Sequence, residues 1–172
     1  MTQPTEPIEF AVAADEITER FTAGSTLSPA VLEDLHKICT TSTEAQSLAE
    51  HGRDWWPLAM HWALNGKTPR KPGAVSTPKT TEQVAALVAA CNKHDLPLTV
   101  AGGRSGVCGS AVPLYGGVVL DVTAMQGIVS VDQVSGIVEV LPGTFGPDFE
   151  NELQSKYALT VGHFPQSFDI ST

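Results

Sequence analysis

The chain has 172 residues, of which 42% are hydrophobic, and it carries a formal net charge of -9 at pH 7. This composition supplies a core for one domain or a compact pair of lobes, and the acidic balance argues against a nucleic-acid-binding surface. Three scattered cysteines argue against a disulfide framework and a cysteine-based metal site, and they favour a reducing, cytoplasmic setting. The longest clearly apolar run, Val84 to Cys91, is far shorter than the ~20 residues of a membrane span.

The first 72 residues are predicted to hold a leader and a set of helices. Residues 1–25 are expected to be a flexible leader, because they begin with "TQPTEP" after the first methionine and end with "TAGST". Residues 26–72 are expected to form a helical region, whose first helix begins at a Ser28 cap followed by Pro29. Two further helical stretches end at Gly52 and Gly66, and the link "KTPRKPG" marks the domain boundary.

Residues 73–172 are predicted to form an α+β domain with two kinds of strand arrangement. The strand "AVSTP", a helix capped by Thr80 and Gln83, and the strand "LPLTVAG" predict a parallel strand–helix–strand unit over residues 74–101. The short strands "GGVVLDV", "GIVSVD" and "GIVEVLPG" predict a mainly antiparallel meander over residues 117–141. A last helix is expected in "GPDFENELQSKY", with Pro147 in its first turn.

Between these two parts lies a loop, "TVAGGRSGVCGSAVPLYGG", that contains six of the fifteen glycines. It lacks the lysine with which a Walker-type loop reaches the terminal phosphates of a nucleotide. It is also not a Rossmann fingerprint, because Pro113 and the Gly116–Gly117 pair forbid the long helix that must follow one. The loop therefore joins strand to strand.

Two interpretations of this glycine loop remain open, a tight turn and an anion-binding nest of backbone amides. In the nest, Gly102 and Gly103 take positive φ and let an oxygen approach their N–H groups closely. Ser105 adds a hydroxyl donor. Arg104 either supplies charge to a phosphate, points to solvent or pairs with Asp121.

The whole arrangement resembles the FAD-binding domain of the vanillyl-alcohol-oxidase / p-cresol-methylhydroxylase flavoproteins. The stretch "PGAVSTPKTTEQVAALVAACNKHDLPLTVAGGRSGVCG" is similar to the family's opening, in which a "T.E.V" helix start precedes a "P...GGGTS" pyrophosphate loop. The segment "GHFPQSFDIST" resembles "GHEPDSLEFST" of the alkylglycerone-phosphate synthase branch, a segment that runs along the flavin. The resemblance covers about residues 43–172.

The resemblance implies cofactor contacts for two short segments. Two positions depart from the family's loop, since Ala101 stands where the first glycine is common and Arg104 replaces a threonine. Arg104 brings a donor fork suited to phosphate in place of a short hydroxyl. The residues implied to contact FAD are Thr99, Val100, Ala101, Gly102, Gly103, Arg104, Ser105 and Gly106 in the loop, and Gln166, Ser167, Phe168, Asp169, Ile170, Ser171 and Thr172 in the second segment.

The resemblance also implies dissociable FAD, because members with covalent flavin usually carry a histidine in or near this loop and none is present here. The implied function is that of the FAD-binding part of a flavin-dependent oxidoreductase or of an alkylglycerone-phosphate synthase-like enzyme. The FAD domain of a D-2-hydroxyacid dehydrogenase, acting on lactate or glycolate, is one alternative. A non-catalytic nucleotide-binding module is another.

The family places its substrate-binding cap and most of its acid and base residues after the FAD domain. No catalytic residue and no metal ligand is therefore assigned in this chain. We expect the chain to be the N-terminal part of a longer enzyme, in which a small-molecule substrate binds through the cap. A homodimer of that enzyme is one of the arrangements left open by the sequence. The isolated 172 residues are expected to bind FAD weakly or not at all and to be inactive.

Three further predictions concern side chains around the loop. Asp121 is expected to orient the loop or Arg104. Cys108 is expected to be a small buried residue without a redox role. Trp55 and Trp56 are expected to pack the N-terminal helices against the rest of the protein.

Overall fold

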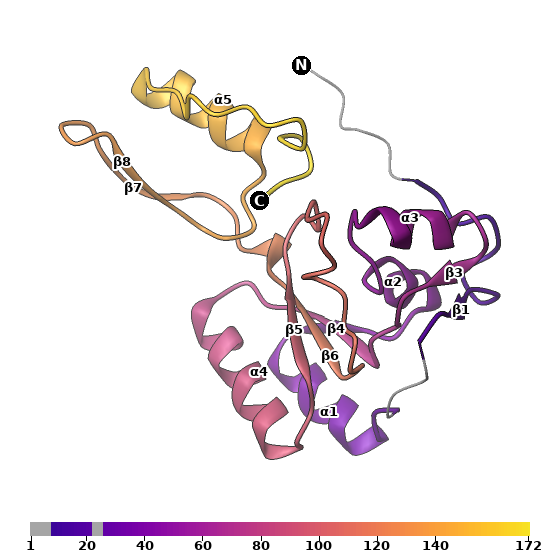
Figure 1. Ribbon diagram of the computed structural model, residues 1–172. Helices are drawn as coiled ribbons and strands as arrows, with labels where there is room; N and C mark the ends of the chain where they lie inside the picture. Colours follow the sequence, from indigo (N-terminus) through magenta and orange to yellow (C-terminus); the bar gives the residue numbers. More distant parts are fainter. Residues whose placement is uncertain (1–7, 22–25) are drawn as a thin grey trace.

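The computed structural model describes residues 8–21 and 26–172, and its centre is a four-stranded sheet (Figure 1). From one edge to the other, the strands are β2 (Thr40–Ser42), β4 (Ala74–Thr77), β6 (Val118–Asp121) and β5 (Leu98–Ala101). β2 runs antiparallel to β4, whereas β6 is parallel to both of its neighbours. The predicted α+β class, with parallel and antiparallel strands, is confirmed.

The predicted strand–helix–strand unit is present, because α4 (Thr81–Lys93) joins β4 to β5. Thr80 caps this helix, accepting a hydrogen bond from the Gln83 N–H at 3.3 Å, as its capping sequence predicts. α4 has 13 residues. Within residues 8–21 and 26–172, no helix is long and apolar enough to cross a membrane.

The position of β6 differs from the prediction. Val118–Asp121 was expected to begin the antiparallel meander, but it lies between β4 and β5 in the parallel part of the sheet. All four of its residues are buried, because helices and loops cover both faces of the sheet at this strand. The antiparallel arrangement is limited to the hairpin of β7 (Ile128–Asp132) and β8 (Ile137–Val140).

Two helices cover one face of the sheet, α4 and the preceding α1 (Pro29–Ile38) (Figure 1). The buried side chains of this layer include Leu35 of α1, Leu87 of α4 and Val118 of β6, each with 0% of its surface exposed. A surface cluster joins the helices, since Asp34 Oδ2 accepts a hydrogen bond from Lys93 Nζ at 2.9 Å. Lys93 first, and then His94, lower the pKa of Asp34 to about 2.

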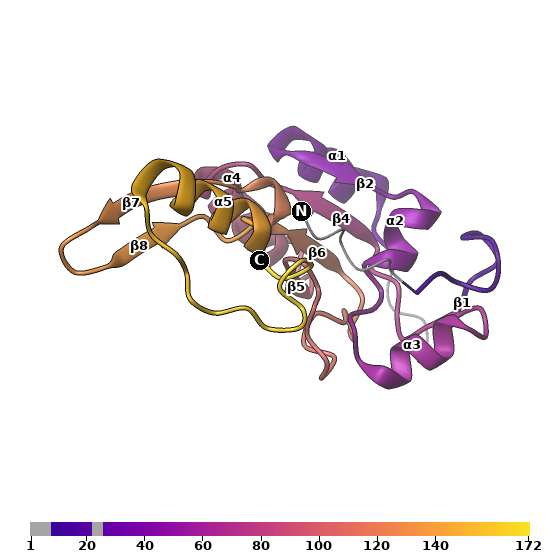
Figure 2. The same cartoon turned by 90° about the horizontal axis from the view of Figure 1, so that it is seen from above.

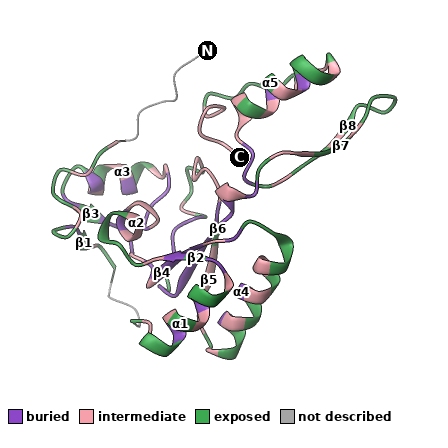
Figure 3. Cartoon of the chain, turned by 180° about the vertical axis from the view of Figure 1, so that it is seen from behind, coloured by how far each residue is buried: buried purple, intermediate pink, exposed green. Residues whose placement is uncertain are grey.

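The helix α2 (Ala45–Glu50) and the later part of the glycine loop pack on the opposite face, and α3 (Pro57–Ala63) follows α2 in the chain. The apolar cluster of this face contains Val75 and Val119, which alternate with the inward residues of the first face. Leu48 of α2 packs against this cluster. Figure 3 shows the buried strands between the two layers.

Part of the predicted leader belongs to the fold. Residues 1–7 and 22–25 lie outside the described residues. Within residues 8–21, β1 (Thr18–Glu19) pairs in parallel with β3 (Lys67–Thr68), and Ile17 is only 3% exposed. The prediction of a loose leader is therefore wrong for these residues, because their partners are about fifty residues further along the chain and leave no local signal.

The boundary predicted at residues 72–73 does not divide the core. Leu35 and Cys39, from before the boundary, share one apolar cluster with Leu87 and Val118, from after it. β2 is also hydrogen-bonded to β4 across the boundary, and the buried hydroxyls of Thr41 and Ser76 lie 2.9 Å apart. The N-terminal region and the sheet are therefore one packing unit.

The last helix, α5 (Gly146–Tyr157), lies with the β7–β8 hairpin beyond one end of the sheet (Figures 1 and 2). It ends at Tyr157, and the next residue, Ala158, has φ 54, so that the chain turns back. Glu150, only 7% exposed, holds this return by accepting hydrogen bonds from Thr160 Oγ1 at 2.7 Å and from the Val161 N–H at 2.9 Å. Glu150 thus anchors the segment that leads to the C-terminus.

We predict that Leu87→Ala lowers the free energy of unfolding by about 2–5 kcal/mol, because it leaves a cavity in a fully buried layer. The three tryptophans all lie before residue 63, so their fluorescence reports on the N-terminal region. Because that region shares the core, we expect urea unfolding monitored by tryptophan to shift together with far-UV circular dichroism. Val88→Ala, at a site that is 40% exposed on the same helix, is the control. A tryptophan transition unmoved by Leu87→Ala would contradict the shared core.

We further predict that Glu150→Leu releases the segment after α5, so that the Val161 amide exchanges its hydrogen faster. The hydrogen bond from the Val161 N–H is the main cause that lowers the pKa of Glu150, with Thr160 and Gln154 contributing, against the opposing effect of burial. This stabilisation is present above the ordinary glutamate pKa and is lost as pH falls through the lowered value. Glu152→Leu, on the same helix, where the half-buried Glu152 pairs with Lys156, is the control. Equal exchange in both variants would argue against the anchor.

Candidate functional site

The glycine loop leaves the sheet at the carboxyl end of β5, directly after Ala101. Because β5 and β6 are parallel, Asp121 at the end of β6 reaches the same edge and pairs in register with Ala101. A crevice at the carboxyl ends of parallel strands is the usual ligand position in open sheets of this kind. The two strand ends therefore mark the place to look for a site.

The two segments predicted to bind the cofactor meet at this edge. The Gly103 N–H donates a hydrogen bond to Thr172 Oγ1 at 3.2 Å. The hydroxyls of Ser171 and Ser105 lie 2.7 Å apart. These contacts join residues more than sixty positions apart, so the fold brings together what the sequence shows only as two separate motifs.

A cavity of about 470 Å³ opens beside this contact. Of the predicted residues, Gly102, Gly103, Arg104, Asp169 and Ile170 line it. The remaining walls come from His51, Trp55, Asp121, Thr123 and Phe145. A neighbouring hollow of about 300 Å³ is lined by Ser105, Gln166 and Ser167, together with Trp55, Val107 and Ile170.

Other predicted residues lie outside the cavity wall. Thr99 and Val100 belong to β5, and Val100 is 59% exposed at the sheet edge. Phe168 packs edge-on against Phe164, with ring centroids 5.1 Å apart. The Gly106 carbonyl accepts a hydrogen bond from the Trp55 N–H at 2.9 Å. These residues shape the segments on either side of the cavity.

The glycines at the start of the loop are needed for space. Among the described residues, Gly102 and Gly103 do not have the positive φ that the sequence analysis expects. A Cβ on Gly103 would lie 1.8 Å from the Ile170 carbonyl oxygen, and one on Gly102 would lie 2.2 Å from Thr172 Oγ1. At the start of the loop it is Arg104 that has a positive φ, at 56°, and Gly109, Gly116 and Gly117 have positive φ further along.

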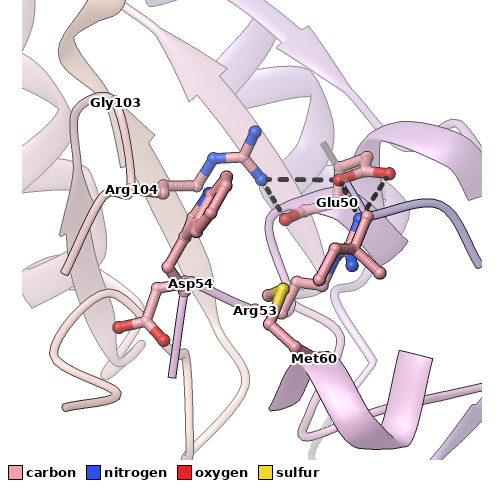
Figure 4. A pocket seen from close by; sticks show the side chains of 8 residues that line it. Glu50, Arg53, Asp54, Met60, Gly103 and Arg104 are labelled. Atoms are coloured by element: carbon pink, nitrogen blue, oxygen red, sulfur yellow. Dashed lines mark hydrogen bonds and ion pairs between the residues drawn. The ribbon is translucent and has the colours of Figure 1, made fainter. Parts of the chain in front are cut away.

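Arg104 also points elsewhere than predicted. Its Nη1 donates a hydrogen bond to the main-chain oxygen of Glu50, the last residue of α2, and lies 3.9 Å from the Glu50 carboxylate (Figure 4). Burial lowers the pKa of Arg104 from its ordinary value, and Glu50 opposes this effect. The guanidinium is therefore directed toward α2 and not toward the Gly102 and Gly103 amides.

Asp121 has a different partner from the one predicted. Its Oδ2 lies 3.3 Å from His51 Nε2, while its Oδ1 accepts a hydrogen bond from the Thr123 N–H at 2.9 Å. Burial raises the pKa of Asp121, but the hydrogen bonds from His51 and Thr123 outweigh this effect and leave the pKa below its ordinary value. Asp121 is thus a carboxylate held in place at the cavity wall.

His51 was missed by the sequence analysis. Its Nδ1 lies 2.9 Å from the Ser47 carbonyl oxygen, so the ring is held between α2 and the end of β6. A lone histidine before a helix-terminating glycine gave no signal, because its partner Asp121 is seventy residues away. Its position depends on the packing of the N-terminal region against the sheet.

The predictions for the two tryptophans and for Cys108 have different outcomes. Trp56 packs edge-on against Trp62 of α3, with ring centroids 5.4 Å apart, a contact within the N-terminal region. Its ring also lies beside Gly109 of the glycine loop, in line with the predicted packing role. Trp55 lies at the cavity. The prediction that Cys108 is buried is wrong, because the loop after Gly106 turns outward and leaves this cysteine exposed.

Residues 72–172, more than half of the chain, match the family model described as FAD binding domain. The chain belongs to this FAD binding domain family. The predicted resemblance to FAD-linked flavoproteins is therefore confirmed, and FAD is the cofactor of the family. The matched residues include both the glycine loop and the segment after α5.

Named relatives support the same family. The chain is 32% identical over 97 residues to a D-lactate dehydrogenase of Anaerostipes hadrus, a match that covers 56% of this chain and 20% of the relative. It is 29% identical over 131 residues to a D-2-hydroxyglutarate dehydrogenase of Stutzerimonas stutzeri, covering 74% of this chain and 26% of the relative. The chain therefore spans about a fifth to a quarter of the length of these two relatives.

Solved structures share the fold over a longer part of the chain. An alkyldihydroxyacetonephosphate synthase superposes with a TM-score of 0.82 at 22% identity, covering 94% of this chain and 33% of that one. A p-cresol methylhydroxylase superposes with a TM-score of 0.71 at 20% identity, covering 87% of this chain and 29% of that one. At these identities the likeness concerns the fold, and it extends into the region before residue 72.

We predict that Gly103→Ala separates the loop from the C-terminal segment, because the added methyl group would meet the Ile170 carbonyl oxygen far inside contact distance. Amides of residues 166–172 should then exchange their hydrogens faster. Gly106→Ala is the matched control, since its Cβ would meet only Ser110 Oγ at 3.2 Å and Asp54 Oδ2 at 3.6 Å. Unchanged exchange in Gly103→Ala would show that the two segments do not pack this closely in solution.

Proposed function

We propose that the 470 Å³ cavity is part of the FAD site and that the amides of Gly102 and Gly103, with the Ser105 hydroxyl, bind the pyrophosphate. The observation that carries this proposal is the meeting of the glycine loop with residues 167–172 at the carboxyl ends of β5 and β6. FAD would supply the oxidation and reduction chemistry. The protein's residues would bind it, orient it and exclude water.

The residues present fit such a ligand. The cavity lies within the usual size range of cofactor pockets, about 300–1,000 Å³. Gly102 and Gly103 have no side chains to keep a phosphate oxygen away from their amides. The Gly103 N–H donates to a hydroxyl, Thr172 Oγ1, which is an acceptor that a phosphate oxygen can replace. Asp169, Ile170 and Phe145 supply the wall on the side of the C-terminal segment.

We propose that the protein containing this chain is a flavin-dependent oxidoreductase that acts on a small molecule. The two named relatives support a D-2-hydroxy acid as its substrate class. A synthase that exchanges an acyl for an alkyl chain is the second candidate, and it is supported by the superposition that includes the N-terminal region. Substrate binding through a further cap domain, a cytoplasmic location and a homodimer are parts of the same proposal.

The proposal is tested by FAD titration of the intact protein, followed by flavin fluorescence. We expect FAD to bind at least ten times more tightly than riboflavin, because riboflavin lacks the pyrophosphate that the loop would hold. Gly103→Val should reduce this preference for FAD. Its side chain would collide with the Ile170 carbonyl oxygen and displace the loop amides that are proposed to bind the pyrophosphate. Equal affinity for FAD and riboflavin would contradict a pyrophosphate role for the loop, and absence of any flavin binding would overturn the function.

We also predict that the bound FAD is dissociable. No histidine lies between Asp95 and Gly162, and Cys108 has no histidine near it in the sequence to activate its thiol. His51 lines the cavity, but both of its ring nitrogens have hydrogen-bond partners, Ser47 and Asp121. Acid precipitation of the yellow protein should therefore leave the flavin in the supernatant. Cys108→Ser should give the same result, and colour retained in the wild-type pellet would contradict non-covalent binding.

A further inference from the structure

The backbone conformation at Arg104 is one that favours glycine. Its φ of 56° lies in the left-handed region, which is costly for a residue with a Cβ and easy for glycine. The loop already contains glycines on either side of this position. An arginine held in this conformation is explained by what its side chain does, because glycine would satisfy the turn without strain.

The side chain joins the loop to the end of α2. Its Nη1 donates to the Glu50 main-chain oxygen, one of the carbonyls at the C-terminus of a helix that lack an intrahelical partner. The positive guanidinium also lies at the negative end of this helix. Figure 4 shows the side chain of Arg104, next to Gly103 in the loop, extended toward Glu50.

Glu50, which accepts the hydrogen bond from Arg104, is itself held in place by a neighbouring side chain. The Glu50 carboxylate accepts two hydrogen bonds from Arg53 Nη2, at 3.2 and 3.0 Å. Arg53 is 3% exposed and stacks over the Phe10 ring, with its guanidinium carbon 4.1 Å from the ring centre. A short way along the loop, the Trp55 N–H bonds the Gly106 carbonyl at 2.9 Å. The loop between Gly103 and Gly106 is thus attached to the α2–α3 region at two points.

We propose that Arg104 is a positioning residue, which clamps the glycine loop to the C-terminus of α2 and does not bind phosphate itself. This inference rests on the proposed FAD site, to which it adds a part of the chain outside the matched residues 72–172. In this arrangement the phosphate-binding donors are backbone amides, and the charge of Arg104 is used to hold them in place. The N-terminal region then contributes to cofactor affinity through the position of the loop.

The test compares three substitutions at one position. Arg104→Gly removes both the clamp and the backbone strain, Arg104→Ala removes the clamp and keeps the strain, and Arg104→Lys keeps the charge without the fork. The matched control is Asp95→Gly, because Asp95 is exposed and has φ 51 away from the loop. If only strain mattered, glycine would stabilise the protein at both positions.

Hydrogen exchange of residues 102–106 without FAD gives the first readout. We expect Arg104→Gly and Arg104→Ala to exchange at least about tenfold faster in this loop, as loss of a charge-assisted hydrogen bond implies, with Arg104→Lys only partly protected. Asp95→Gly should leave the loop unchanged. If residues 102–106 exchange their hydrogens as slowly in Arg104→Gly as in the wild type, the proposed clamp is wrong.

FAD titration at several salt concentrations gives the second readout. We expect Arg104→Ala to weaken FAD binding about tenfold or more while the salt dependence stays as in the wild type, because no phosphate-bound charge is lost. A weaker salt dependence in Arg104→Ala, with wild-type affinity in Arg104→Lys, would overturn the proposal in favour of a direct phosphate contact. If the wild type binds no FAD, the proposed function fails, and the exchange measurement still decides whether the clamp exists.

Discussion

The parallel pairing of β6 between β4 and β5 is the constraint on which the rest of the structure depends. Because these strands run the same way, their carboxyl ends open on one edge, where Ala101 releases the glycine loop and Asp121 ends β6. A central strand must also be covered on both faces, which requires α1 and α4 on one side and the α2 region on the other. The N-terminal region is consequently a structural part of the sheet, and it supplies His51 and Trp55 to the cavity.

The glycine loop is held from two directions by different kinds of contact. On one side, Arg104 and Gly106 are hydrogen-bonded to Glu50 and Trp55. On the other side, Gly102 and Gly103 approach the C-terminal segment so closely that a single methyl group would not fit. A loop fixed in this way keeps its amides in position before any ligand arrives, which reduces the ordering cost of binding.

Much of the fold follows from local sequence signals. The cap at Thr80, the prolines at the starts of α1 and α5 and the apolar strands place most of the helices and strands correctly. The two motifs of the site were also recognisable as separate stretches. The sequence could not place Val118–Asp121, because a strand buried on both faces has no alternating pattern that distinguishes a parallel from an antiparallel neighbour. It also missed His51 and the direction of Arg104, since both depend on contacts between residues more than fifty positions apart.

The strand order has a consequence for how the chain is made. β6 is the last of the four sheet strands to be synthesised, yet it is the one that joins β5 to β4 and β2. While the ribosome has delivered only the first hundred residues or so, β5 has no hydrogen-bonded partner, and the apolar faces of α1 and α4 have no complete sheet to cover. The core therefore cannot form before Val118–Asp121 has been synthesised. Until then the apolar faces of α1 and α4 are exposed, and exposed apolar surface of this kind is what chaperones bind.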